Sequence, residues 1–173
     1  MQAFWAAITA LGDIRFWLLA LLFIGVYASL EKRKLSRQAK RALRMLLFTF
    51  IAVALAVQAL KMAVDAPRIC MPCPGEACNP YCPADDPYAF PSGHAALSFA
   101  MFAAAWLALP KNARQRARLA WMFAIPVLVA ASRVVLAVHT PGQVAAGAML
   151  GIFVAALVWR RTKGINEDCS ERI

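Results

Sequence analysis

Residues 45–64 read MLLFTFIAVALAVQALKMAV, an almost uninterrupted apolar stretch whose single charged residue, Lys61, lies near its end. A helix of about 20 residues spans the roughly 30 Å of hydrocarbon in a bilayer, so this stretch is long enough to cross a membrane. The composition agrees, because 62% of the 173 residues are hydrophobic and 16% are charged, against about half and about a quarter in soluble domains. It excludes a disordered chain, a coiled coil and an ordinary cytosolic domain. Further apolar runs lie at 16–30, 91–109, 119–138 and 141–159.

Together these runs predict an all-α fold, a polytopic membrane helix bundle of five transmembrane helices that forms one domain over residues 1–173. Residues 1–12 are apolar with aromatic side chains, so they predict an amphipathic interfacial helix or a re-entrant sixth helix. The segment 65–90 contains six prolines and is expected to be an irregular loop. Residues 160–173 are expected to be a polar tail.

The basic residues explain the formal net charge of +10 and set the expected orientation. Fifteen of the nineteen lie in 31–44, 110–118 and 160–173, which five spans would place on one side of the membrane. The positive-inside rule makes that side cytoplasmic. We therefore expect a protein of the cell (inner) membrane with a cytoplasmic carboxyl terminus and an outward amino terminus. The positive charge is then a topology signal, and nucleic acid is not an expected partner.

The few cations on the opposite, outer side are informative because that side is depleted of them. Lys61, Arg68 and Arg133 fall at outer span ends, and so do both histidines, His94 and His139. For a single cation, snorkelling of the side chain to the interface is a sufficient explanation. Three cations and two imidazoles together indicate a phosphoryl-transfer site. One imidazole can attack phosphorus, the other can protonate the leaving oxygen, and the cations can hold the phosphate.

The stretch FPSGHAAL around His94 supports an anion site. Pro91 suits the first turn of a helix, where its missing N–H costs little. Ser92 and Gly93 would follow in that turn, with free N–H groups at the positive end of the helix dipole. Gly93 would let a ligand approach the backbone closely. The alternative is a capped helix start without a ligand.

These residues resemble the type 2 phosphatidic acid phosphatase family, whose motifs are Lys-x6-Arg-Pro, Pro-Ser-Gly-His and Ser-Arg-x5-His-x3-Asp. The resemblance covers about residues 61–143. The first motif is similar to residues 61–68, KMAVDAPR, although Ile69 follows where the family has proline. The second matches residues 91–94 outright. The third matches Ser132, Arg133 and His139, but Gln143 stands where the family has aspartate.

The resemblance implies a lipid phosphate or diphosphate phosphohydrolase that works through a phosphohistidine intermediate at the outer membrane face, without a metal or other cofactor. His139 would be the nucleophile and His94 the general acid. The phosphate oxygens would be bound by Lys61, Arg68, Ser92, Gly93 and Arg133. The His-Thr-x-x-Gln pattern at 139–143 resembles dolichyl diphosphate phosphatases, which favours a polyprenyl diphosphate as substrate. Lipid A 1-phosphate and phosphatidylglycerol phosphate are the alternatives, and a lipid phosphotransferase is a related activity.

Gln143 has two interpretations. Its carbonyl oxygen can accept a hydrogen bond from His139, as the family aspartate does, but without the negative charge. It can also form a capping box with Thr140 and Pro141 at a helix start. If the charge is needed, Asp85, Asp86 or another acidic residue on the outer side is the candidate to supply it. A non-catalytic lipid-phosphate binder is the alternative that this departure from the family suggests.

Four cysteines lie in the outer loop at Cys70, Cys73, Cys78 and Cys82. On an oxidising face they predict two disulfides, with three possible pairings. A zinc or iron–sulfur site is the alternative that their spacing allows. A membrane thiol oxidoreductase that uses the C-x-x-C of Cys70 and Cys73 is the corresponding alternative function.

Overall fold

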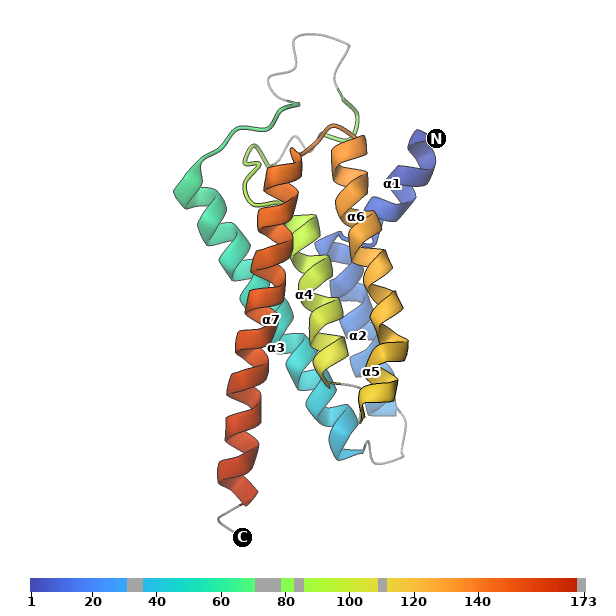
Figure 1. The fold of residues 1–173 in the computed structure, drawn as a ribbon, viewed down its shortest axis with the longest axis vertical. Coiled ribbons are helices and arrows are strands. Elements are labelled where there is room, and N and C mark those ends of the chain that lie inside the picture. Colours follow the sequence, from blue (N-terminus) through green and yellow to red (C-terminus); the bar gives the residue numbers. More distant parts are fainter. Residues whose placement is uncertain (31–35, 71–78, 83–85, 109–111, 171–173) are drawn as a thin grey trace.

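The computed structural model describes residues 1–30, 36–70, 79–82, 86–108 and 112–170, and within them the chain is a bundle of helices without a named strand (Figure 1). In chain order the helices are α1 (Gln2–Ala10), α2 (Ile14–Leu30), α3 (Arg37–Val64), α4 (Gly93–Ala108), α5 (Ala113–Ala120), the short 3₁₀ helix η1 (Trp121–Phe123), α6 (Ala124–Val135) and α7 (Pro141–Ser170).

Helix α4 forms the centre of the bundle and contacts α3, α6 and α7 (Figure 1). Its alanines at 95, 96, 100 and 104 are completely buried. Two glycines of α7 allow the two backbones to approach closely. A Cβ atom at Gly147 would lie 2.4 Å from the Ser92 carbonyl oxygen, and one at Gly151 would lie 2.2 Å from that of Ala96. The small residues therefore let α7 pack closely against the first turns of α4.

The number of membrane spans differs from the simple expectation of five. Among the described residues, two helices are long and apolar enough to cross a membrane, Gln38–Val64 and Pro141–Lys163. The pair α1 and α2 makes a third if it counts as one span bent by 47°. Gly93–Ala108 and Trp121–Val135 are apolar but shorter. The helical membrane fold is confirmed, whereas the count of five or six spans is not.

The ends of the elements also differ from the expected ranges. Helix α3 begins eight residues before the apolar run at 45, with Ser36 as its N-cap. Helix α7 continues to Ser170, so the described part of the expected tail is helical. In the described parts of 65–90 the expected irregular loop is confirmed, with an isolated antiparallel bridge between Pro67 and Tyr88.

The two ends of the bundle differ in charge. The start of α3, helix α5 and the end of α7 lie together at the lower end of Figure 1. They carry the basic residues Lys40, Arg41, Arg44, Arg114, Arg160, Arg161 and Lys163. The end of α3, the start of α4 and the connection from α6 to α7 lie toward the opposite end. The cations and histidines singled out from the sequence belong to that second end.

Candidate active site

The site is assembled from four elements that are distant in the sequence. Lys61 comes from the last turn of α3, and Arg133 from the last turn of α6. Ser92 precedes α4, and His139 lies between α6 and α7. These four residues and Arg68 are each at most 6% exposed. Burial of so many polar groups in one place is costly unless they are paired or bind a ligand, so the arrangement indicates a site.

Arg68 is the central residue of the site. Its Nη1 atom lies 3.0 Å from Nε2 of His139. Its Nη2 atom donates to the Asp86 carboxylate at 2.7 Å, and its Nε atom donates to the Asp86 backbone carbonyl. Lys61 also forms an ion pair with this carboxylate. The guanidinium therefore joins the nucleophile candidate to an acidic residue that the family motifs do not contain.

Asp86 balances part of the positive charge. Burial by itself raises the pKa of this carboxyl, but the hydrogen bonds and charges of Lys61 and Arg68 outweigh burial and hold the pKa below its usual value. Asp86 is therefore ionised at neutral pH. The sequence suggested Asp85 or Asp86 as a substitute for the charge missing at Gln143. Asp86 instead contacts the two cations, and Asp85 lies outside the described residues.

The contacts of His139 decide which ring nitrogen carries the proton. A guanidinium can only donate, so Nε2 of His139 accepts from Arg68. The other nitrogen, Nδ1, lies 3.2 Å from Oε1 of Gln143 and donates to it. The neutral ring therefore carries its lone pair on Nε2, where it accepts from Arg68. This is the tautomer that a nucleophile attacking a bound phosphate requires.

Burial lowers the pKa of His139 from 6.5 to about 4, because the charged ring loses its hydration. The positive charges of Arg68 and Arg133 add to this effect, while the hydrogen bond to Gln143 opposes it. The imidazole is therefore neutral near pH 7. A neutral ring among cations can attack phosphorus without first losing a proton.

Both interpretations of Gln143 are seen. Its Oε1 atom accepts from Thr140 N at 3.0 Å in addition to His139, and its own N–H donates to Thr140 Oγ1 at 3.3 Å. This reciprocal pair is a capping box at the start of α7. Because the backbone of Thr140 donates to Oε1, the orientation of the side-chain amide is fixed as well. One residue thus caps the start of the helix and orients the His139 ring.

The expected anion cradle at the start of α4 needs a correction. The N–H of Ser92 is not free, because it donates to the Gln143 carbonyl at 3.1 Å, and α4 begins at Gly93 instead of at Pro91. The Ser92 hydroxyl is completely buried and has no hydrogen-bond partner among the described residues. Nε of Arg133 is likewise buried and has no hydrogen-bond partner among the described residues. These two polar atoms are available to an anion.

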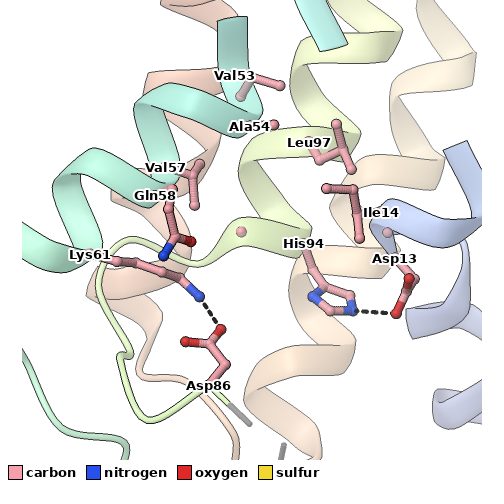
Figure 2. A pocket seen from close by; sticks show the side chains of 12 residues that line it. Asp13, Ile14, Val53, Ala54, Val57, Gln58, Lys61, Asp86, His94 and Leu97 are labelled. Atoms are coloured by element: carbon pink, nitrogen blue, oxygen red, sulfur yellow. Dashed lines mark hydrogen bonds and ion pairs between the residues drawn. The ribbon is translucent and has the colours of Figure 1, made fainter. Parts of the chain in front are cut away.

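His94 and Arg133 are contacted from the amino-terminal helices, which the motifs did not indicate. Nη1 of Arg133 donates to Thr9 Oγ1 at 2.9 Å. Nε2 of His94 lies 3.9 Å from Oδ2 of Asp13. Figure 2 shows His94 with Asp13, and Lys61 with Asp86, at one cavity of about 230 Å³. No sequence pattern within 1–13 indicated these contacts.

Two of the four cysteines in the segment 65–90 belong to the described residues. Cys70 and Cys82 form a disulfide within the segment 65–90, and Cys70 follows Arg68 by two residues. The other two, Cys73 and Cys78, lie outside the described residues. Cys70 is thus paired with Cys82 and not with Cys73, so the C-x-x-C disulfide of a thiol oxidoreductase is not formed here. Among the described residues, no group of three His, Cys, Asp or Glu side chains is placed to hold a metal ion.

Two solved structures have a similar fold. LpxE of Aquifex aeolicus superposes with a TM-score of 0.67 at 22% identity, covering 92% of this chain and 85% of that chain. A PAP2-type phosphatidylglycerolphosphate phosphatase of Bacillus subtilis superposes with a TM-score of 0.70 at 24% identity, covering 96% and 77%. No curated protein matches the sequence significantly.

The family model described as the PAP2 superfamily matches residues 42–167, from early in α3 almost to the end of α7. The match includes every residue of the three motifs. It leaves out α1 and α2, which contact the site through Thr9 and Asp13. Since the match spans well over half of the sequence, the chain belongs to the PAP2 superfamily.

Proposed function

We propose that the protein is a membrane lipid phosphatase that hydrolyses a phosphate or diphosphate head group through a phosphohistidine intermediate. The observation that supports this most directly is the state of His139. Its Nε2 atom carries the lone pair and accepts from Arg68, a phosphate-binding candidate, while its Nδ1 proton is donated to Gln143. The buried hydroxyl of Ser92, without a partner, is a further group that a phosphate oxygen would satisfy.

The reaction would proceed in two displacements. Nε2 of His139 attacks phosphorus and the bond from phosphorus to the leaving oxygen breaks, while protonated His94 gives its proton to that oxygen. Water then attacks the phosphohistidine and gives a proton to His94. The phosphorus–nitrogen bond breaks, which releases inorganic phosphate and restores His139. Lys61, Arg68 and Arg133 hold the non-bridging oxygens throughout, together with Ser92 Oγ and the Gly93 amide. These steps require no metal ion.

The cavity supports a lipid as substrate because its lining changes from polar to apolar. Asp13, Lys61, Asp86 and His94 line its polar part. The apolar part is formed by Ile14, Val53, Ala54, Val57 and Leu97. Lys61, Gly93 and His94 are the proposed site residues that line this cavity, and a hydrocarbon chain can continue beside the apolar residues toward the bilayer. The lining does not include His139, Arg68, Arg133 or Ser92.

The substrate that we favour is a polyprenyl diphosphate, cleaved to the monophosphate. The support for it is Gln143 in the His-Thr-x-x-Gln pattern at 139–143, a pattern that resembles dolichyl diphosphate phosphatases. The fold similarity to LpxE and to a phosphatidylglycerolphosphate phosphatase keeps lipid A 1-phosphate and phosphatidylglycerol phosphate as alternatives.

We further propose that the site faces the outside of the cell membrane, which is the periplasm in a cell with two membranes, and that the carboxyl terminus is cytoplasmic. The support is the segregation of basic residues at the start of α3, in α5 and at the end of α7, away from the site.

The test is release of inorganic phosphate by the purified protein in detergent with EDTA. The substrates are undecaprenyl diphosphate, lipid A 1-phosphate, phosphatidylglycerol phosphate and phosphatidic acid. We expect release that survives chelation and is lost in His139→Ala, whereas Asp65→Asn, at an exposed site on the same end, keeps the wild-type rate. Phosphate that appears on a second lipid instead of in solution would identify a phosphotransferase. Binding of all four lipids without turnover would refute the phosphatase.

A further inference from the structure

The break between α1 and α2 lies directly against the site. The two helices meet at an angle of 47° around Leu11, Gly12 and Asp13. A Cβ atom at Gly12 would lie 2.6 Å from Val129 Cγ1 and 3.1 Å from Cβ of His94. Only a residue without a side chain fits there, so the break is held between α4 and α6. Helix α1 also packs on α6.

This position brings the Asp13 carboxylate to the general acid candidate. Its two oxygens have different contacts. Oδ1 accepts from Arg15 N at 2.7 Å, which caps the start of α2. Oδ2 lies 3.9 Å from Nε2 of His94. The His94 side chain is 28% exposed and that of Asp13 is 39% exposed, and both line the cavity (Figure 2).

The other ionisable groups that act on His94 are cations or a second imidazole. They are Lys61 of α3, Arg68 of the outer loop, Arg133 of α6 and His139 of the connection to α7. Asp86 lines the same cavity, but Lys61 and Arg68 engage its carboxylate. Asp13 is therefore the acidic side chain that faces His94 among the described contacts.

We propose that Asp13 is a positioning residue that holds the His94 imidazolium with its Nε2 proton directed into the cavity. The proposal rests on the proposed function, in which His94 protonates the leaving oxygen. The separation of 3.9 Å exceeds the length of a hydrogen bond. When His94 is protonated the two side chains form an ion pair, and their separation leaves room for the leaving oxygen or a water molecule at Nε2. Thr9, which holds Arg133, gives the same segment a second contact with the site.

A residue that acts through the general acid has a signature that a purely structural residue lacks. Protonation of the leaving oxygen matters most when the leaving group is a poor one. A lipid alkoxide, as in phosphatidic acid, needs the proton, whereas p-nitrophenolate leaves readily without it. Loss of Asp13 function should therefore slow the first substrate and spare the second.

The test uses Asp13→Asn in the full-length protein in detergent. Asparagine keeps an oxygen that caps α2 but removes the charge. We expect kcat for phosphatidic acid to fall about tenfold, with kcat for p-nitrophenyl phosphate within about twofold of wild type. Asp13→Glu should recover part of the loss, because it restores the charge. An equal loss with both substrates, or no loss with either, would overturn the proposal.

The matched control is Asp65→Asn. Asp65 is exposed at the C-cap of α3 with a φ of 48°, a conformation that asparagine adopts well. The substitution Asp65→Asn removes one negative charge from the same end of the bundle without touching a contact of His94. We expect no change in kcat for phosphatidic acid or for p-nitrophenyl phosphate.

A second readout separates this proposal from the proposed function. In the His139→Asn background His94 is the single histidine, so its ring signals in an NMR spectrum are unambiguous. We expect these signals to move in Asp13→Asn and to stay in place in Asp65→Asn, whether or not any lipid is hydrolysed. Signals that stay in place in Asp13→Asn would refute the pairing. If wild type releases phosphate from none of the four lipids named above while the signals do move, the phosphatase fails and the pairing stands.

Discussion

Gln143 offers a sharp test of how His139, the proposed nucleophile, is held, because variants of similar size change one property at a time. Gln143→Leu removes the acceptor of His139 Nδ1, while Gln143→Glu keeps the reach and adds a charge. In the wild-type structure Oε1 is 3.2 Å from His139 Nδ1 and 3.0 Å from Thr140 N. The two variants should therefore move the rate in opposite directions.

The magnitudes follow from the strength of one hydrogen bond. A neutral hydrogen bond contributes about 1 kcal/mol net, so Gln143→Leu should lower kcat about fivefold. The loss stays moderate because Arg68 still fixes the tautomer through Nε2. A charged acceptor roughly doubles the strength of the bond. As positive charge develops on His139 during attack, Gln143→Glu should raise kcat by about fivefold.

The assay is single-turnover phosphate release in detergent at saturating lipid, with thermal unfolding measured in parallel. Thr140→Ala is the control, because it removes the hydroxyl that accepts from Gln143 N but leaves the bond to His139 intact. We expect it to cost about 1 kcal/mol of stability while kcat stays near wild type. If Gln143→Leu keeps the wild-type kcat and Gln143→Glu lowers it, the residue acts as a helix cap alone and the reasoning is refuted.

Two further predictions concern packing and protonation. Gly151→Leu should lower the unfolding free energy by at least about 2 kcal/mol, because its Cβ would meet the Ala96 carbonyl oxygen at 2.2 Å. Gly25→Leu is the control, because a side chain at Gly25 would enter open space. Equal melting temperatures of the two variants in detergent would contradict the close packing. In the His94→Asn variant, NMR should show His139 titrating near its lowered pKa of about 4, and a midpoint near 6.5 would contradict its burial. Because the folded pKa lies below the unfolded one, the unfolding free energy should fall as the pH drops from about 6.5 to 4.

The sequence was sufficient to predict the class of fold and to single out most of the buried polar residues that lie together at one end of the bundle. In a chain that is 62% hydrophobic, polar residues at the ends of apolar runs are rare and therefore visible. Lys61, Arg68, Arg133 and His139 were found in this way, and the structure places them together. The span count could not be predicted equally well. Apolar runs show which residues avoid water, but not where a helix begins, bends or continues.

The partners of the site residues depended on tertiary structure. Asp86 contacts Lys61 from 25 positions away, and Thr9 contacts Arg133 from 124 positions away. No local periodicity encodes such pairs, because they arise only when helices from different parts of the chain pack side by side. The same reason explains why the N–H of Ser92 is occupied, since its acceptor is the Gln143 carbonyl on a different helix.

The sequence by itself thus determined that this is a helical membrane protein with two imidazoles and a group of cations at one end. It did so because solvation of apolar and charged side chains is a property of each residue. Only the tertiary structure decided the tautomer of His139, the pairing of Cys70 with Cys82 and the approach of Asp13 to His94. Those features are distances between residues far apart in the chain, and close packing of the helices, made possible by glycine and alanine at their contacts, sets these distances.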